Sequence, residues 1–317
     1  MDILPNIVAA IGDTPLVRLS RLHPPGNLVA KIEFMNPGGS IKERIAAAMI
    51  DRAEEEGLLG PGGTIIEPTS GNTGVGLALV AAVRGYRVIC TVPDKVSREK
   101  QDLLRAYGVE VVETPAEYGP DLPDSYYGVA NKLAAEIEGA FQPNQYFNEA
   151  NPRAHYETTG PEIWEQTDGT IDVLVAGVGT GGTISGAGRF LKERKPSLEV
   201  VGADPEGSIY TQGPDGNIRQ YLVEGVGEDF YPETVELDVI DRFIEVTDAE
   251  SFAMARRLAR VEGVLTGGSG GLAVEASLRV AGEDEGRLVV VVVPDSGRGY
   301  LSKVFDDRWM ESKGFET

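Results

Sequence analysis

The segment Asp172-Val173-Leu174-Val175-Ala176-Gly177-Val178-Gly179-Thr180-Gly181-Gly182-Thr183 joins an apolar run to a loop rich in glycine and threonine. Residues 171–176 are typical of a buried parallel strand, and a helical pattern follows over residues 183–195. In open α/β folds, ligands bind beyond the carboxyl ends of the strands, where free N–H groups at a helix start attract anions. The segment therefore predicts an α/β fold with a phosphate-binding loop at this strand end.

The same alternation of short β-branched runs and helical patterns covers most of the chain, as in parallel sheets flanked by helices. We expect further strands at residues 29–34, 64–67, 87–92, 109–113, 199–203 and 287–293. We expect further helices at residues 41–56, 73–84, 97–107 and 126–138, and after the capping-box pair Thr247 and Glu250. The length of 317 residues suits one large or two ordinary domains, and the acidic stretch 206–231 is expected to be irregular or a lid.

The composition excludes several classes of partner and site. With 29 Lys and Arg against 50 Asp and Glu, the net charge is −21, so nucleic acids and anionic membranes are not expected as partners. One cysteine, Cys90, and two histidines, His23 and His155, make a disulfide or a metal site unexpected. Because we find neither a signal-peptide pattern nor an apolar run of about 20 residues, we expect a cytoplasmic protein.

Three further segments place polar side chains beside a turn or a helix start. In Asn36-Pro37-Gly38-Gly39-Ser40-Ile41-Lys42, a glycine turn delivers a lysine to a helix start, which favours a neutral, nucleophilic amine; a solvated lysine is the alternative. In Glu67-Pro68-Thr69-Ser70-Gly71-Asn72-Thr73-Gly74, hydroxyls and free N–H groups form a cradle for a carboxylate or a phosphate. In Val293-Pro294-Asp295-Ser296-Gly297, the polar cluster either binds a heterocycle nitrogen or closes a turn.

The glycine loop taken alone has two interpretations. Gly177, Gly179 and Gly182, with Asp204 about 20 residues later, also satisfy the dinucleotide-binding fingerprint. The loop by itself therefore predicts a bound phosphate without identifying the molecule that carries it.

Taken together and in this order, the four segments resemble the pyridoxal-phosphate β-replacement enzymes of the cysteine synthase and cystathionine β-synthase family. The resemblance runs from Ile11-Gly12-Asp13-Thr14-Pro15-Leu16 to the end of the sequence. It implies pyridoxal 5'-phosphate as cofactor and a tryptophan-synthase-β-like fold (PLP fold type II), with the cofactor between two α/β domains of a homodimer. It also implies a smaller, mobile domain over residues 42–150, and a larger phosphate-binding domain from residues 1–41 and 151–317. A dinucleotide would explain neither Lys42 nor the hydroxyl-rich loop.

The resemblance also implies roles for single residues. Lys42 resembles the lysine that holds the cofactor and acts as the catalytic base. The other positions implied to hold the cofactor are Asn72 for its ring hydroxyl, Ser296 for its ring nitrogen, and Gly179, Thr180, Gly181, Gly182 and Thr183 for its phosphate. The positions implied to hold the substrate are Thr69, Ser70, Gly71, Asn72, Thr73 and Gln145 for its carboxylate. Tyr146 is expected to be a further catalytic residue that contacts the aminoacrylate or the second substrate, with a packed aromatic side chain as the alternative.

Several segments are similar to the cystathionine β-synthase branch of the family, among them Gln145-Tyr146, Gly267-Gly268-Ser269 and Asp204-Pro205-Glu206-Gly207-Ser208. This branch joins L-serine and L-homocysteine to give L-cystathionine and water. Cysteine synthesis from O-acetylserine or O-phosphoserine with sulfide is the nearest alternative, and a catalytically silent relative is another. Neither haem nor a C-terminal regulatory tandem is expected.

Overall fold

The structure, a computed structural model, describes residues 3–69, 71–94, 96, 98–115 and 122–317. It divides into two compact units. The first unit comprises Asn36–Ala150 with the N-terminal segment up to Ile11, and the second comprises Gly12–Met35 with Asn151–Thr317. The sequence analysis had assigned residues 1–41 to the larger domain. The structure places η1 (Ile7–Ala10) and residues 36–41 in the first unit, because η1 packs on α2 and residues 36–41 lead directly into α1.

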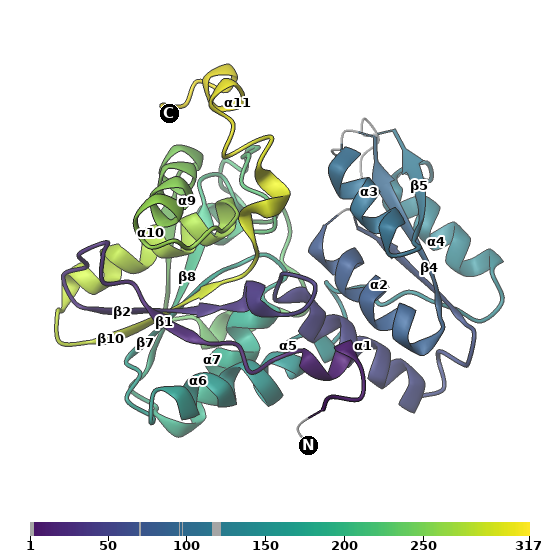
Figure 1. The fold of residues 1–317 in the computed structure, drawn as a ribbon, viewed down its shortest axis with the longest axis horizontal. Helices are drawn as coiled ribbons and strands as arrows, with labels where there is room; N and C mark the ends of the chain where they lie inside the picture. Colours follow the sequence, from purple (N-terminus) through teal and green to yellow (C-terminus); the bar gives the residue numbers. More distant parts are fainter. Residues whose placement is uncertain (1–2, 70, 95, 97, 116–121) are drawn as a thin grey trace. The chain divides into compact units, whose positions relative to one another are not determined.

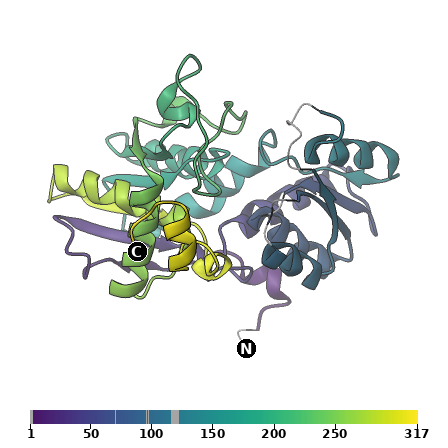
Figure 2. The same ribbon diagram turned by 90° about the horizontal axis from the view of Figure 1, so that it is seen from above.

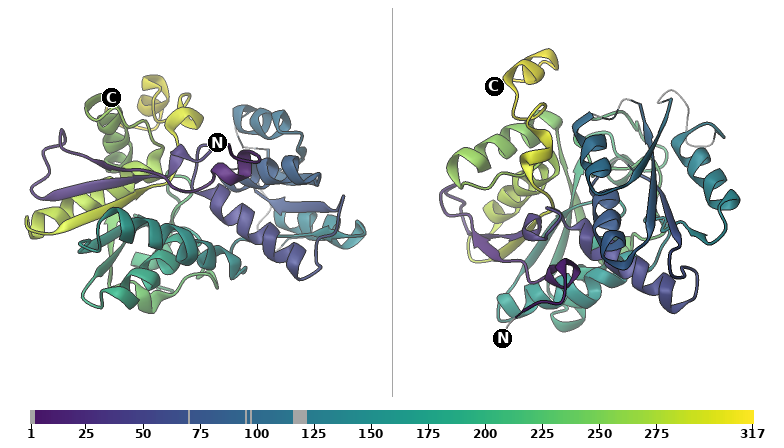
Figure 3. Two further views of the ribbon diagram at one scale, coloured as in Figure 1. Left: turned by 60° about the horizontal axis from the view of Figure 1, so that its bottom comes forward. Right: turned by 45° about the vertical axis from the view of Figure 1, so that its right-hand side comes forward.

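The first unit is built on a parallel sheet with the strand order β5-β4-β3-β6. Its strands are β3 (Thr64–Pro68), β4 (Arg87–Pro93), β5 (Glu110–Thr114) and β6 (Ala140–Phe141). Its helices are α1 (Lys42–Glu55), α2 (Asn72–Arg84), α3 (Arg98–Ala106) and α4 (Tyr126–Glu136). Helices α1 and α2 pack on each other, while α4 covers the opposite face of the sheet from α2 (Figures 2 and 3).

The second unit is built on a sheet with the strand order β1-β2-β10-β7-β8-β9, in which β1 runs antiparallel to β2 and the other pairs are parallel. The strands are β1 (Leu16–Arg18), β2 (Asn27–Ile32), β7 (Val173–Gly177), β8 (Glu199–Pro205), β9 (Arg242–Val246) and β10 (Leu288–Val293). The larger helices are α6 (Gly160–Gln166) and α7 (Gly182–Arg194) on one face, and α9 (Asp248–Val261) and α10 (Gly268–Glu283) on the other (Figure 1). Shorter elements are α5 (Ala150–Ala154), a π-helix (His155–Thr159), α8 (Ile209–Gln212) and α11 (Asp307–Ser312).

The α/β fold with mostly parallel sheets is confirmed, and each expected strand and helix is present within a few residues of its predicted ends. The elements that were not predicted from the sequence are β1, β6, β9 and the helices α5, α6, α8, α10 and α11. Helix α10 begins Gly268-Ser269-Gly270-Gly271, a composition that disfavours helix locally. Packing explains it: a side chain at Gly271 would overlap the backbone of α9 at Ser251, so the glycine lets the two helices approach closely.

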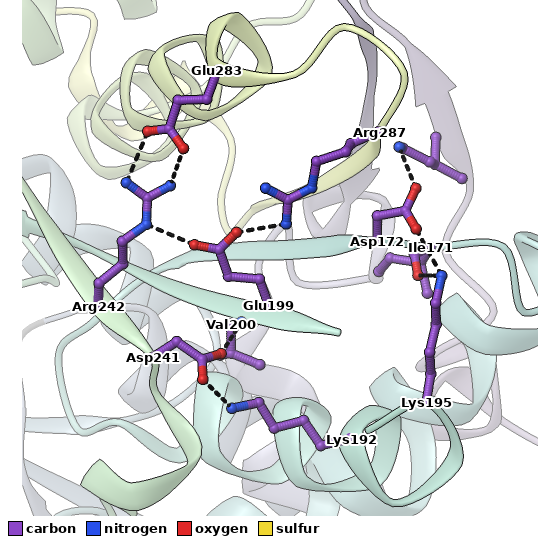
Figure 4. A network of polar contacts seen from close by, with 11 residues as sticks. Ile171, Asp172, Lys192, Lys195, Glu199, Val200, Asp241, Arg242, Glu283 and Arg287 are labelled. Carbon is purple, nitrogen blue, oxygen red and sulfur yellow. Dashed lines mark hydrogen bonds and ion pairs between the residues drawn. The ribbon is translucent and has the colours of Figure 1, made fainter. Parts of the chain in front are cut away.

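Ion pairs join the amino ends of the parallel strands in the second unit, at the edge opposite the predicted binding loops (Figure 4). Glu199, at the start of β8, accepts hydrogen bonds from Arg242 Nε at 2.6 Å and from Arg287 at 2.5 Å, and Arg242 also pairs with Glu283. Partial burial pushes the pKa of Glu199 upward. The hydrogen bonds from the two arginines outweigh this effect and hold the pKa below its ordinary value of 4.5.

Glu199→Gln is expected to lower the free energy of unfolding of the second unit by about 1 kcal/mol at pH 7. Because the pKa of Glu199 is lower in the folded state, its contribution is complete above pH 4.5 and is lost as the pH falls through the folded-state value. Urea unfolding followed by tryptophan fluorescence measures this unit, since both tryptophans, Trp164 and Trp309, lie in it. A difference between wild type and variant that stays constant from pH 7 to pH 3 would contradict the assignment.

Candidate functional site

The lysine segment of the first unit is held by a capping arrangement around the start of α1. Lys42 is the first residue of α1, and its backbone N–H donates to Ser40 Oγ at 3.1 Å. The buried Glu43 carboxylate accepts the N–H of Ser40 at 3.1 Å. A side chain at Gly38 would overlap this carboxylate. The bonds of Ser40 and Glu43 therefore fix the backbone around Lys42. Ser40-x-x-Glu43 has the spacing of a capping box, and the structure shows one of its two bonds, from the Ser40 N–H to the Glu43 carboxylate.

Helix α2 approaches the same lysine through a glycine. A Cβ atom at Gly76 would lie 3.0 Å from the Lys42 carbonyl oxygen and 3.1 Å from Ala46 Cβ. The start of α1 is therefore packed against α2, the helix that begins with the hydroxyl-rich loop. Lys42 and Asn72 are 30 positions apart in the sequence. The loop before Lys42 (residues 36–41) and the hydroxyl-rich loop before Asn72 both belong to the first unit, and the helices that they lead into pack on each other.

The hydroxyl loop follows β3 and leads into α2. Buried Thr69 accepts the N–H of Gly71 at its Oγ1, at 3.3 Å, and buried Thr73 donates from its Oγ1 to Gln145 Oε1 at 2.8 Å. Gly71, the N-cap residue of the helix that follows, has extended geometry. Three of the predicted residues, Thr69, Thr73 and Gln145, thus belong to this unit and are buried, Asn72 and Tyr146 are half-buried, and Ser70 lies outside the described residues.

A buried carboxyl that the sequence analysis did not assign supports this loop. Glu67, in β3, accepts the backbone N–H of Asn144 at 2.9 Å and of Gln145 at 3.3 Å. Burial raises the pKa of Glu67 to about 7, which outweighs the opposite effect of the two N–H groups. Glu67 therefore holds the backbone that presents the Gln145 side chain to Thr73. An acidic residue in an otherwise apolar strand was the available signal.

Glu67→Gln is expected to raise KM for the substrate whose carboxylate the hydroxyl loop is predicted to hold, about threefold at pH 8.5 and less at pH 6. The two N–H groups bond different oxygens of the Glu67 carboxylate, and a glutamine replaces one of these oxygens with an NH2 group that cannot accept a hydrogen bond. Below about pH 7 the wild-type carboxyl is itself protonated, and the two side chains become more alike. The measurement is KM against pH, with the exposed Glu149→Gln as control. An equal KM for wild type and Glu67→Gln at pH 8.5 would exclude this role.

The glycine loop of the second unit runs from the end of β7 to the start of α7. Gly181 caps α7 with a φ of 78°, a left-handed conformation that suits glycine, and no side chain of the cap residue bonds the first helical N–H groups. A Cβ atom at Gly179 would lie 2.8 Å from the Gly225 carbonyl oxygen, and a side chain at Gly182 would overlap Asn151. Glycines thus create a tight backbone cradle with N–H groups at the start of a 13-residue helix.

Both threonines of this loop contact side chains from the preceding helical segment. Asn151 Nδ2 donates to Thr180 Oγ1 at 3.0 Å, and His155 Nε2 lies 3.2 Å from Thr183 Oγ1. His155, which begins the π-helix, also contacts Thr159 Oγ1 through Nδ1 at 2.9 Å. Neither Asn151 nor His155 carried a sequence signal for this role, because each lies about 30 residues before its threonine.

The fourth segment closes a short turn after β10. Ser296 Oγ accepts the N–H of Arg298 at 3.3 Å, which caps the 3-10 helix Gly297–Tyr300. The neighbouring Asp295 is buried, and its Oδ2 accepts the Tyr300 hydroxyl proton at 2.7 Å. The turn-closing interpretation of Ser296 is therefore observed directly, while its proposed bond to a cofactor nitrogen stays a prediction.

The residues present fit pyridoxal phosphate in their chemistry. The second unit offers a glycine cradle at a helix start for a phosphate, and the first unit offers an amine at a helix start and hydroxyls for a carboxylate. Within the described residues, no group of three or more His, Cys, Asp and Glu side chains could hold a metal ion. None of the helices in the described ranges combines the length and the apolar composition of a membrane span.

The chain is similar in sequence to pyridoxal-phosphate dependent enzymes. The profile of the family described as "Pyridoxal-phosphate dependent enzyme" matches residues 7–295. The chain is 51% identical over 321 residues to a cystathionine beta-synthase from Oryctolagus cuniculus, covering 99% of this chain and 58% of the relative. It is 45% identical over 323 residues to that of Saccharomyces cerevisiae, covering 96% of this chain and 64% of the relative. The chain thus spans about three-fifths of the length of these relatives.

Two solved structures have the same fold over nearly their whole length. The structure of a hydrogen sulfide-producing enzyme from Fusobacterium nucleatum matches with a TM-score of 0.89 and 36% identity, over 94% of this chain and 98% of that one. The structure of an O-ureido-L-serine synthase matches with a TM-score of 0.91 and 36% identity, over 98% of this chain and 99% of that one.

Proposed function

Because the chain belongs to the pyridoxal-phosphate dependent enzyme family, we propose that it catalyses replacement of the hydroxyl group of L-serine by the thiol of L-homocysteine, giving L-cystathionine and water. The observation that carries this proposal is the identity of 45% to 51% to cystathionine beta-synthases from several species, across nearly all of this chain. The lysine, hydroxyl and glycine loops supply the chemical groups that such a reaction needs.

Residues of both units bind the cofactor in this proposal. The loop 179–183 binds the cofactor phosphate, Asn72 bonds the ring hydroxyl, and Ser296 meets the ring nitrogen as a neutral partner. When bound, pyridoxal phosphate supplies a conjugated ring that accepts the electron pair left on the substrate's α-carbon. Lys42 holds the cofactor in the resting enzyme, and its Nζ then takes the α-proton as a general base and returns it at the end.

The first unit binds the amino-acid substrate in this proposal. The substrate carboxylate is held by the hydroxyls of Thr69 and Ser70, the side-chain amide of Gln145 and backbone N–H groups that include those of Gly71 and Thr73. The hydrogen bond between Thr73 and Gln145 keeps both side chains in one arrangement before the substrate arrives. Tyr146, next along the chain, contacts the second substrate.

The substrate assignment is tested by comparing turnover of the purified enzyme with two sets of substrates. We expect cystathionine formation from serine plus homocysteine to exceed cysteine formation from O-acetylserine or O-phosphoserine plus sulfide. If the enzyme turns over only O-acetylserine or O-phosphoserine with sulfide, the alternative, cysteine synthesis, is favoured. Protein that binds pyridoxal phosphate without turnover in any of these assays would be a catalytically silent relative.

We also propose that the protein acts as a homodimer in the cytoplasm; the family resemblance supports the dimer. Size-exclusion chromatography with light scattering, at several protein concentrations, measures the mass of the assembly. A mass of about 34 kDa, that of one 33.9 kDa chain, would contradict the dimer.

A further inference from the structure

Two hydroxyl groups from the stretch between β8 and β9 bond neighbouring carbonyl groups of the glycine loop. Tyr210, in α8, donates from its hydroxyl to the Gly179 carbonyl oxygen at 2.6 Å. Thr234 donates from Oγ1 to the Thr180 carbonyl oxygen, also at 2.6 Å. Both side chains are buried. The connection between β8 and β9, which includes the stretch 206–231 expected to be irregular or a lid and continues to Thr234, therefore fixes the orientation of two successive peptide groups.

Because the peptide group is planar, the direction of each carbonyl group fixes the direction of the N–H group that follows it. In a trans peptide the C=O and the following N–H point in opposite directions. With the Gly179 and Thr180 carbonyls turned toward Tyr210 and Thr234, the N–H groups of Thr180 and Gly181 point away from those hydroxyls. Within the described part of the chain, neither N–H has a hydrogen-bond acceptor, although both residues are buried. Because buried N–H groups are normally hydrogen-bonded, these two are suited to bind an acceptor from outside the chain.

We propose that Tyr210 and Thr234 are positioning residues that aim the N–H groups of Thr180 and Gly181 at the cofactor phosphate. They also turn the electronegative carbonyl oxygens of Gly179 and Thr180 away from that dianion, which those oxygens would otherwise repel. This inference rests on the proposed placement of the phosphate in the loop 179–183.

The surroundings of Tyr210 hold its ring in one position. The ring stacks on Phe243, with centroids 5.5 Å apart and planes at 8°, and meets Tyr231 edge-on at 5.9 Å. Asp204, at the end of β8, accepts the N–H and the hydroxyl of Thr211 at 3.1 and 3.0 Å, which anchors α8. Burial raises the pKa of Tyr210, so the hydroxyl keeps its proton as a donor at physiological pH.

Thr234 is fixed to the other side of the loop. A side chain at Gly181 would overlap Val235, so the backbone of the loop lies directly against this segment. The N–H of Glu236 donates to Ser185 Oγ in α7 at 2.8 Å. The segment carrying Thr234 is therefore attached to the same helix whose start forms the cradle.

The test compares Tyr210→Phe and Thr234→Val, which each remove one hydroxyl, with two matched controls. Tyr231→Phe removes the neighbouring hydroxyl, which donates to Ile209 at 3.3 Å and not to the loop, and Thr234→Ser keeps the donor. The measurements are the dissociation constant of pyridoxal phosphate for the apo-protein and the ³¹P resonance of the bound phosphate. Thermal melting of each apo-protein separates loss of binding from loss of folding.

We expect Tyr210→Phe and Thr234→Val each to weaken cofactor binding about threefold to tenfold and to shift the ³¹P resonance, while both controls resemble wild type. Thr183→Val distinguishes the two ways in which this expectation could fail. If Thr183→Val weakens binding but Tyr210→Phe and Thr234→Val do not, the positioning role is wrong and the phosphate site stands. If Thr183→Val and both test variants all match wild type, the phosphate lies elsewhere. If Tyr210→Phe does not fold, the Thr234→Val and Thr234→Ser pair decides the question.

Discussion

Lys42→Ala is expected to lower kcat for cystathionine formation by about a thousandfold or more, the largest effect of any single substitution considered for this chain. The variant loses both the amine that holds the cofactor and the base that takes the α-proton. Its backbone should stay in place, because the hydrogen bonds of Ser40 and Glu43 at this helix start do not involve the Lys42 side chain. Initial rates under saturating serine and homocysteine give kcat directly.

A second lysine substitution separates the specific role of Lys42 from the loss of a positive charge. Lys132→Ala removes an exposed lysine of α4 whose nearest partner is Glu136 at 4.0 Å, and kcat should be unchanged. Circular dichroism checks that both variants are folded. A Lys42→Ala enzyme that keeps a tenth or more of wild-type kcat would remove Lys42 from the catalytic step.

Glu162→Gln is expected to lower the free energy of unfolding by about 3 kcal/mol. Lys31, in β2, is fully buried, and its Nζ donates to Glu162 Oε2 at 2.6 Å, to the Thr14 carbonyl at 2.6 Å and to Gln166 Oε1 at 2.9 Å. The substitution keeps the shape of the side chain but removes an anionic partner of a buried ammonium group. Urea unfolding followed by tryptophan fluorescence measures the loss, since Trp164 lies in the same helix as Glu162.

The double variant Lys31→Met with Glu162→Gln tests the physical reason for this loss. It removes the buried ammonium group as well, so we expect it to recover most of the stability. If the double variant is no more stable than Glu162→Gln alone, loss of packing rather than an uncompensated charge causes the effect.

The parts of the fold that could be predicted are those in which local pattern and tertiary packing agree. The apolar runs of β7 and β10 and the capping pair of α9 are readable locally, and the structure confirms them. Helix α10 was missed because glycines that disfavour helix in isolation are needed where it packs on α9. The unit boundary near residue 36 was missed because it depends on packing of the N-terminal η1 against α2, which no local pattern records.

In the candidate site, too, only some of the residues could be predicted from the sequence. Residues expected to touch a ligand directly lie in short loops after strands, and their clustering makes them visible in the sequence. Residues that support these loops are distant in sequence: Tyr210 lies 31 positions from Gly179, and Thr234 lies 54 positions from Thr180. A tyrosine or threonine that donates to a backbone carbonyl leaves no composition signal, so only the structure reveals it.

The proposed chemistry requires covalent attachment of the cofactor to one side chain, and peptide mapping after borohydride reduction tests this attachment. Reduction fixes the cofactor permanently to the amine that holds it, and mass spectrometry of a proteolytic digest then locates the added mass. We predict a single modified peptide with the added mass on Lys42. A modification found on another lysine, or an unmodified peptide containing Lys42 from fully reconstituted enzyme, would show that Lys42 does not hold the cofactor.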